Sequence, residues 1–258
     1  MFLTMLPTWQ AAILIVLLPT LLAVMGPFIV RRFVKLERLR TNNEVAGFKF
    51  ATVGVLYAVL LAFVVIVVWQ KFNDADTVAS KEAGAIATIY RISADLPDVH
   101  ALHLRAALGN YLTSVTQKEY RTMQEGKPSE DTRAALDALY AELLRLKTDT
   151  PRQAMVLGEM LRQLDLVTQM RRARLVASTG VVPGVLWVTL IIGAIGTLGF
   201  TLFFGTPNVR AQAAMTGILS ILLFFGLLIV VSFDHPFSGS VRVTTAAFDA
   251  IANDFIKR

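Results

Sequence analysis

The sequence predicts an all-α membrane protein: four transmembrane helices, with a helical extramembrane insert between the second and third spans. Two observations favour this class. Four long apolar stretches contain no Asp, Glu, Lys, Arg or His, namely Trp9–Val30, Ala51–Trp69, Val182–Phe204 and Ala213–Phe233. The composition agrees, because 55% of the 258 residues are hydrophobic and the mean hydropathy is +0.57.

Each stretch is close to the roughly 20 residues that a helix needs to cross a hydrocarbon core about 30 Å thick. Lipid cannot satisfy exposed backbone N–H and C=O groups, so these stretches should be helices. A soluble protein with four buried core helices is the alternative, but four uncharged stretches of this length exceed what a soluble core needs. The first span lacks the basic start and cleavage site of a signal peptide, and we expect it to be retained.

The chain then divides into four segments. Residues 1–69 hold the first two spans and a basic connecting loop, 70–179 form the insert, 180–234 hold the last two spans, and 235–258 form a short C-terminal tail. No part of the insert shows sustained alternation of polar and apolar residues, so we expect helices and no sheet there.

Start and stop signals divide the insert into helices. Ser129 precedes two acidic residues and is predicted to cap one helix. Thr150 precedes Pro151 and is predicted to cap a second. Asp98 is expected to cap a third, with Leu102, Ala106 and Leu112 on one side of it. The stretch QEGKP, residues 124–128, is the clearest turn.

The second span should continue beyond the membrane. After Trp69, an apolar stripe with steps of three and four residues runs on through Phe72, Ala75, Ala79, Glu82, Ile86 and Ile89. No proline interrupts it before Pro97. We therefore predict one helix from about Glu44 to Asp95, with a hinge at Asn73–Asp74 as the alternative.

Small residues form a ridge along the second span. They are spaced by three or four positions and lie on one side of a helix: Gly47, Ala51, Gly54, Ala58 and Ala62. A similar set in the third span is Gly193, Gly196 and Gly199. Small residues let helix backbones approach closely in lipid. The ridge therefore packs inside one subunit or, alternatively, faces a subunit interface or a pore.

Polar residues gather at the span ends, and the connectivity sorts them into two groups. The loop before the second span and the loop before the fourth share one face of the membrane, so Asn43 and Glu44 can meet Arg210. On the other face, Asp234 can meet Arg171, Arg172 or Arg174. An unpaired carboxylate at the membrane boundary is costly, which favours such pairing. Ordinary interfacial solvation without a fixed partner is the alternative.

The charge distribution predicts an orientation. The loops before the second and fourth spans, which share one face of the membrane, hold seven basic residues: Arg31, Arg32, Lys35, Arg38, Arg40, Lys49 and Arg210. Short segments of the other face offer only Arg242, Lys257 and Arg258. The excess of positive charge places the loops in the cytoplasm and the insert outside it.

Three motifs resemble those of a known family. They are NNEVAGFKFATVGVLYAVLLAFVVIVVW at residues 42–69, RRARLVASTGVVPGVLW at 171–187 and DHPFSG at 234–239. In this order they resemble the bestrophin-like domain family of bacterial membrane proteins. The motifs are specific to that family but specify no chemistry.

The resemblance implies a distant likeness to bestrophins, which are pentameric anion channels with four spans per subunit and a helical domain between the second and third. It also implies a cytoplasmic insert, against the charge count. The acidic calcium-binding cluster of animal bestrophins has no clear counterpart here.

Other function classes find little support. There is no HExxH, GxSxG, Walker or GxGxxG motif, and cysteine is absent, so we expect no enzyme activity, cofactor or metal. His100 and His103 lie three apart without a third ligand nearby, which favours a solvated helix face. The sequence pI of 9.8 reflects basic residues at span ends, where lipid headgroups rather than nucleic acid account for them.

Two hypotheses remain for a multi-pass protein of the inner (plasma) membrane, with the lipid bilayer as its surroundings. The first is a homo-oligomeric anion channel with the second span lining the pore. The second is a non-conducting scaffold or sensor whose helical insert binds a protein partner.

Overall fold

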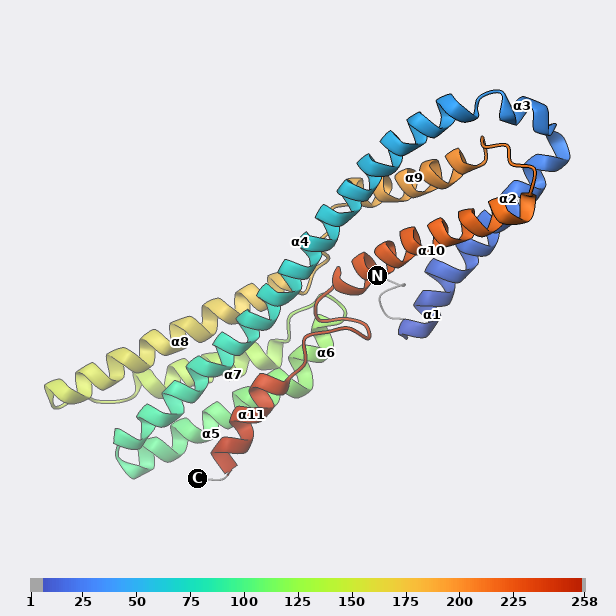
Figure 1. Ribbon diagram of the computed structural model, residues 1–258. Coiled ribbons are helices and arrows are strands. Elements are labelled where there is room, and N and C mark those ends of the chain that lie inside the picture. Colours follow the sequence, from blue (N-terminus) through green and yellow to red (C-terminus); the bar gives the residue numbers. More distant parts are fainter. Residues whose placement is uncertain (1–6, 257–258) are drawn as a thin grey trace. The chain divides into compact units, whose positions relative to one another are not determined.

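The computed structural model describes residues 7–256, which form helices and no strand. The predicted fold class is thereby confirmed (Figure 1). Lys257 and Arg258, which were counted among the basic residues of the tail, lie outside the described residues. Two compact units are present. The membrane unit comprises Met1–Gln70, Gly180–Asp234 and Gly239–Val241, and the insert unit comprises Lys71–Thr179, His235–Ser238 and Arg242–Arg258.

The membrane unit supplies the spans of a multi-pass membrane protein. Four helices are long and apolar enough to cross a membrane: Trp9–Phe33, Asn43–Asp95, Gly184–Thr201 and Val209–Phe233. The first is built from α1 (Thr8–Ala12), a π-helical segment η2 (Ile13–Leu17) and α2 (Leu18–Phe33). The short α3 (Leu36–Arg40), α4 (Asn43–Ile92), α9 (Gly184–Thr201) and α10 (Val209–Phe233) follow.

Helix α10 packs along α2, and α4 packs against α9 within the membrane unit. The hydroxyl groups of Thr20 and Ser220 lie 3.2 Å apart between α2 and α10. The hydroxyl of Tyr57 on α4 donates to the carbonyl of Leu190 on α9 at 3.0 Å. These neutral hydrogen bonds satisfy polar groups that would otherwise be costly in lipid.

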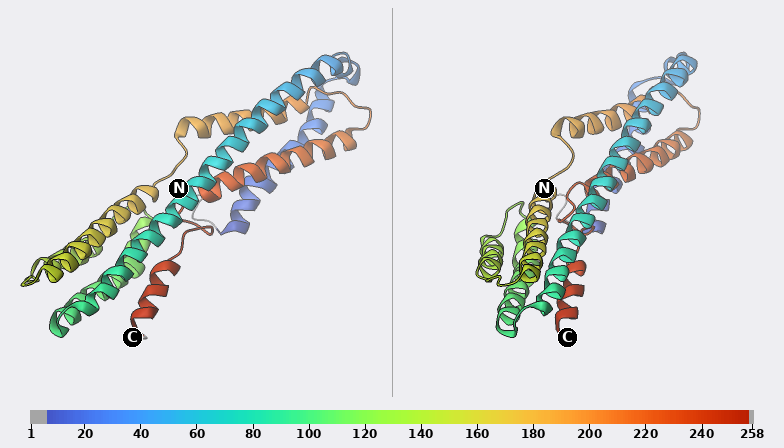
Figure 2. Two further views of the ribbon diagram at one scale, coloured as in Figure 1. Left: turned by 60° about the vertical axis from the view of Figure 1, so that its left-hand side comes forward. Right: turned by 90° about the vertical axis from the view of Figure 1, so that its left-hand side faces the viewer.

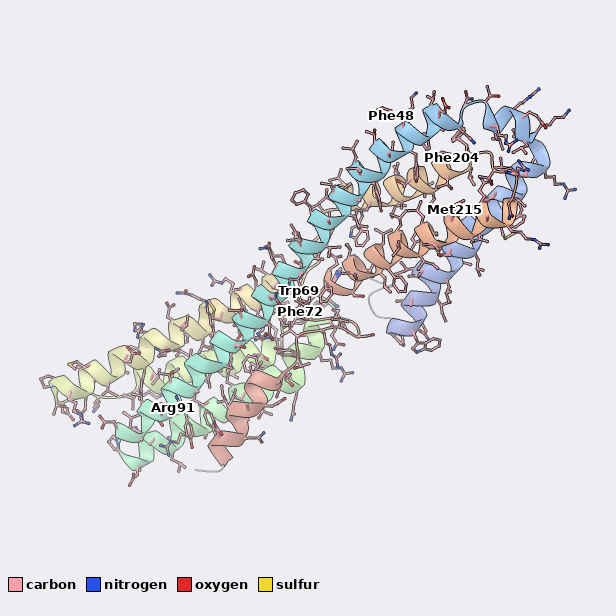
Figure 3. The ribbon with its side chains drawn as sticks, viewed as in Figure 1. Phe48, Trp69, Phe72, Arg91, Phe204 and Met215 are labelled. Carbon is pink, nitrogen blue, oxygen red and sulfur yellow. The ribbon has the colours of Figure 1, made fainter. Side chains whose placement is uncertain are left out.

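Helix α4 is continuous over 50 residues, from Asn43 to Ile92. The predicted long helix is confirmed, and the alternative hinge at Asn73–Asp74 is absent. Figure 3 places Phe48, Trp69 and Arg91 along it. A short 3₁₀ turn, Ser93–Asp95, ends the run ahead of Pro97.

The insert unit packs helices around the Lys71–Ile92 part of α4. They are α5 (Asp98–Ser114), the π-helical segment η4 (Val115–Glu119), α6 (Tyr120–Met123), α7 (Glu130–Leu144), α8 (Pro151–Ala177) and α11 (Ala246–Ile256) (Figure 2). Ala75, Ile86 and Ile89 of α4 are buried in one core with Leu108 of α5 and Leu164 of α8. The apolar stripe read from the sequence is therefore the packed face of this helix.

Two of the predicted helix caps are present. Ser129 accepts a hydrogen bond from the backbone of Thr132 at 3.3 Å. Thr150 accepts from the backbone of Gln153 at 3.2 Å, and the Gln153 side chain accepts from the Thr150 backbone at 3.1 Å. This reciprocal pair is a capping box. The predicted turn between α6 and α7 contains Gly126 at φ 71°.

The predicted cap of α5 was wrong. The helix begins at Asp98 itself, after Pro97, and has no side-chain cap. Leu102 is 68% exposed, whereas Leu104 and Leu108 are buried. Apolar residues lie on several sides of this helix, so spacing alone could not show which side meets the core.

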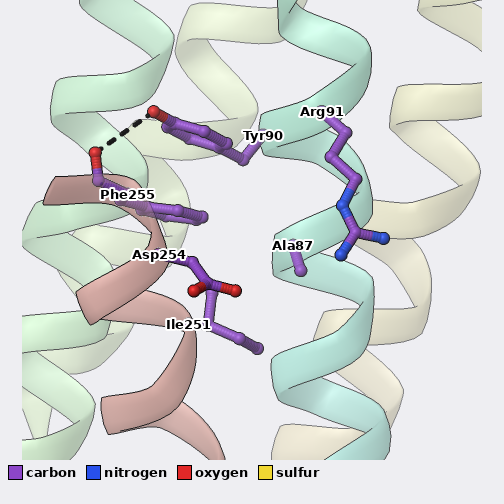
Figure 4. Close-up of a pocket in the computed structure, with 6 residues that line it drawn as sticks. All are labelled: Ala87, Tyr90, Arg91, Ile251, Asp254 and Phe255. Carbon is purple, nitrogen blue, oxygen red and sulfur yellow. Dashed lines mark hydrogen bonds between the residues drawn. The ribbon is translucent and has the colours of Figure 1, made fainter. Parts of the chain in front are cut away.

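The C-terminal tail contributes a helix, α11, that the sequence analysis did not anticipate. The rings of Phe255 on α11 and Tyr90 on α4 stack with centroids 3.7 Å apart and planes 11° apart. The Tyr90 hydroxyl donates to the Phe255 carbonyl at 3.4 Å. Figure 4 shows this contact beside the side chains of Arg91 and Asp254. The stacked rings attach the tail to the insert core.

Candidate functional site

The small-residue ridge of α4 lies outside the packed interior of the membrane unit. The buried side of the same stretch consists of Ala46, Tyr57, Val64 and Val68. The ridge residues Ala51, Ala58 and Ala62 are exposed. A Cβ atom added at Gly54 would meet nothing within 4 Å, and one at Gly47 would only touch Phe204 at 3.9 Å. The described part of this chain therefore leaves the ridge largely uncovered.

The glycines of α9 behave differently from one another. A Cβ atom at Gly193 would lie 2.5 Å from the ring of Tyr57, closer than real contacts allow. At Gly196 and Gly199 it would meet nothing within 4 Å. Gly193 thus permits the close approach of α4 and α9, and the other two are not needed for it.

Hydrogen bonds join the start of α4 to the loop between α9 and α10. The Asn43 side chain donates to the Gly205 carbonyl at 2.9 Å and accepts from the Gly205 backbone N–H at 2.9 Å. Asn43 was expected near Arg210, but its partner is this backbone. Asn208 caps α10 by accepting from the backbone of Arg210 at 3.1 Å. The side chains of Glu44 and Arg210 are exposed.

Asp234 ends α10 and holds the chain segment that leads into α9. Its Oδ1 accepts hydrogen bonds from the backbone of Val181 at 2.9 Å and of Val182 at 2.7 Å. Backbone N–H donors thus supply part of the pairing that a boundary carboxylate requires. The sequence analysis had assigned that role to the arginines of α8.

Those arginines instead belong to a buried ion cluster of the insert unit. Arg174 donates from Nε to Glu82 at 2.8 Å and from Nη2 to Glu119 at 2.7 Å. Arg171 donates to Glu119 as well. The side chains of Glu82, Glu119 and Arg174 are 0% exposed. Two carboxylates thus balance two guanidinium groups, and of the four side chains only that of Arg171 is partly exposed, at 11%.

Further groups complete the cluster. The Tyr111 hydroxyl donates to Glu82 at 2.8 Å. Burial, then the charge of Glu82, hold the pKa of Tyr111 well above its ordinary value. Burial alone would lower the pKa of Arg174, but Glu82 and Glu119 outweigh it and raise that pKa. Arg174 also lies over the ring of Tyr120, 5.4 Å from its centroid. The raised pKa keeps Arg174 charged, and its guanidinium is hydrogen-bonded to both carboxylates.

Arg171 and Arg174 thus have carboxylate partners within the insert unit, whereas the expected contact of Asp234 with an arginine of α8 stays a prediction. The two arginines are three positions apart and share the inner face of α8, whereas Arg172 between them is exposed. Sequence analysis missed both carboxylate partners. One signal was present, because Glu82 stands inside the apolar stripe of α4, where a charge must have a buried partner.

The described residues contain no group of three or more His, Asp or Glu side chains able to hold a metal ion. His100 and His103 are exposed on α5. Their position agrees with the solvated helix face expected from their spacing.

Comparison with known proteins complements this geometry. The profile of the Bestrophin-like domain matches residues 17–248. Two crystal structures of a bacterial bestrophin homolog from Klebsiella pneumoniae, each with a single mutation, are similar to the chain. One is 17% identical, covering 93% of this chain and 98% of that chain with a TM-score of 0.66. The other is 16% identical, covering 93% and 97% with a TM-score of 0.69.

A further crystal structure, described as that of a membrane protein, is 18% identical, covers 93% of this chain and 97% of that chain and has a TM-score of 0.65. At these identities the likeness concerns the fold. Comparison with curated proteins gives no match.

Proposed function

Because this chain belongs to the bestrophin-like domain family, we propose that it forms an oligomeric anion channel in which α4 lines the conducting path. Bestrophins, which the family resembles, are pentameric anion channels. The observation that carries the proposal is the small-residue ridge of α4, which the described part of this chain leaves largely uncovered.

The surface of α4 supports this assignment because it has three sectors. One sector, with Tyr57 and Val64, packs inside the membrane unit. A second carries large exposed apolar side chains such as Leu56 and Phe63, which suit lipid. The third is the ridge. Lipid contact does not require small residues, whereas the close approach of another helix does.

The ridge would control conduction through wetting. The side chains of Ala51, Ala58 and Ala62 offer no charge and no hydrogen bond to an ion. A narrow path lined by such groups conducts only while water fills it, so its width and polarity set the open fraction. A symmetric assembly around α4 would bring one copy of the ridge from each subunit to the path.

Basic side chains at a pore mouth would favour anions. Arg210 is exposed at the start of α10, in the membrane unit, and its field would enrich anions locally. Arg171 and Arg174 are unsuited to this role, because their charges are neutralised by buried carboxylates.

The test is planar-bilayer recording of the purified oligomer. We expect Ala58→Ser to raise conductance by easing wetting, and Ala58→Leu to reduce it or to block assembly, because overpacking at a helix contact is costly. Val59→Leu is the matched control, since Val59 lies on the large-residue sector. Arg210→Gln should lower anion preference, and the loss should shrink at high salt.

The result that would overturn the proposal is a folded, oligomeric wild-type protein with no current above the leak of an empty bilayer. If Ala58→Leu and Val59→Leu changed the conductance equally, the protein would still be a channel, but the ridge of α4 would not line its path. Absence of current would favour the scaffold hypothesis, in which the insert binds a protein partner.

A further inference from the structure

The insert unit contains a hollow of about 290 Å³ that lies outside the proposed path and shares only Tyr120 with the ion cluster. Its wall joins η4 and α6 to the segment that leads into α11. Polar and basic side chains on the wall include Thr116, Arg121, Gln124, Arg242, Thr244 and Thr245. No Asp or Glu is among the lining residues. The hollow therefore has a net positive lining.

Its two guanidinium groups are free to bind. Within the described residues, Arg121 and Arg242 have no ion pair and no side-chain hydrogen bond, and both are exposed. Other arginines of the insert, such as Arg152 and Arg162, pair with nearby carboxylates. Asp249, the acidic residue at the start of α11, accepts from the Thr245 hydroxyl at 2.6 Å.

Neutral donors add to the two charges. The side-chain amide of Gln124 has no hydrogen-bond partner within the part of the chain that the structure describes. The Thr244 hydroxyl oxygen accepts from the backbone of Ala246 at 3.4 Å, which leaves its proton able to donate. Unsatisfied donors of both kinds thus line one hollow.

The wall is held in place by the chain itself. The Tyr120 hydroxyl donates to the Thr244 carbonyl at 3.2 Å, and the Val243 backbone donates to the Pro236 carbonyl at 2.7 Å. Ser238 donates to the backbone carbonyl of Gln124 at 3.4 Å. These bonds tie the tail to α6, so that a ligand would meet a largely preformed site.

We propose that this hollow binds a phosphate monoester group. Arginine forms charge-assisted, often bidentate hydrogen bonds with phosphate. Arg121 and Arg242 come from two different elements, which suits the oxygens of a tetrahedral dianion better than the two oxygens of a planar carboxylate. The group could belong to a soluble molecule or to a lipid headgroup. A lipid headgroup is considered because Arg242 lies only nine residues after Phe233, the last residue of the span α10.

The test measures thermal unfolding of the full chain in two arms. In the first, detergent-solubilised protein receives inorganic phosphate or chloride at matched ionic strength. In the second, nanodiscs contain phosphatidic acid or phosphatidylcholine alone. Each arm compares wild type with Arg121→Gln/Arg242→Gln and with Arg133→Gln/Arg172→Gln, which removes the same charge elsewhere in the insert. Phosphate also stabilises proteins non-specifically, but that effect is common to all three.

At a phosphate concentration ten times Kd, wild type and the control double variant Arg133→Gln/Arg172→Gln should gain about 3–6 °C more in Tm than the pocket pair, Arg121→Gln/Arg242→Gln. A gain in the phosphate arm indicates a soluble ligand, and a gain only with phosphatidic acid indicates a headgroup. An equal gain in wild type and in Arg121→Gln/Arg242→Gln, or no gain in either arm, overturns the proposal. If the pocket pair does not fold, the single variant Arg242→Gln carries the same comparison.

Discussion

The membrane unit leaves most of its apolar surface open, whereas the insert unit encloses its own. In the most apolar windows of the first three spans, only 17%, 22% and 28% of residues are buried inside this chain. In the insert, side chains as large as Ile86, Leu108 and Met160 are 0% exposed. The insert can therefore be stabilised by its own contacts. The membrane unit depends on lipid and, in the proposed oligomer, on other subunits.

The two units also differ in how they bury polar groups. The contacts between the spans are neutral, such as those of Tyr57 and of Thr20 with Ser220, because charge within a bilayer is expensive. The insert buries Glu82, Glu119 and Arg174 completely. It follows that loss of one charge should damage the insert most, and loss of close packing should damage the membrane unit most.

The largest effect is expected from Arg174→Met. Removal of this guanidinium leaves the carboxylates of Glu82 and Glu119 with one buried cation between them, and such a loss costs about 3–5 kcal/mol. Limited proteolysis and thermal unfolding of the purified protein should show an insert that opens readily. Arg172→Met, two positions earlier and exposed, is the control and should behave like wild type. Similar stability of the two variants would mean that the cluster contributes little.

The next effect concerns close packing in the membrane unit. Gly193→Ala places a methyl group against the ring of Tyr57, whose hydroxyl is tied to the Leu190 carbonyl. Such overpacking costs about 1–3 kcal/mol. Gly196→Ala meets nothing and should be neutral or stabilising, by up to about 1 kcal/mol. Thermal unfolding in one detergent compares them directly. Equal Tm values for the two variants would show that α4 and α9 can separate without loss.

The sequence predicted the parts of this fold that local patterns determine. Span lengths follow from lipid thickness, and the continuity of α4 follows from its unbroken stripe. Ser129 and Thr150 were found because the signals of a helix start, two acidic residues and a proline, follow them directly. In each of these cases the signal and the structure lie in the same stretch of chain.

The ion cluster could not be predicted in the same way. Arg174 binds Glu82 across 92 positions and Glu119 across 55. Nothing in the spacing of α8 identifies these partners, since Arg171, Arg172 and Arg174 look alike as a basic run. Only tertiary packing decides which of them face inward. The hollow near Arg242 was hidden for the same reason, because its wall joins α6 to the tail.

A smaller effect is expected at the boundary carboxylate. Asp234→Ala removes the acceptor shared by the backbone N–H groups of Val181 and Val182. Because these groups are part-buried, the expected loss is about 1–2 kcal/mol, toward the low end of the cost of unsatisfied donors. Asp137→Ala, exposed on α7, is the control. A Tm for Asp234→Ala equal to that of the control would argue against this role.

The smallest effect separates local helix signals from the buried cluster on the same helix. Thr150→Ala removes the side-chain acceptor of the α8 capping box, which should cost about 1 kcal/mol. Thr150→Ser keeps the hydroxyl and should restore most of the loss, while Thr148→Ala, exposed and two positions earlier, should change nothing. Because the cap only fixes the start of α8, protease resistance of the insert core should survive Thr150→Ala and fail in Arg174→Met. If the cap variant instead opened the insert as widely, α8 would depend on its first turn more than on the buried charges.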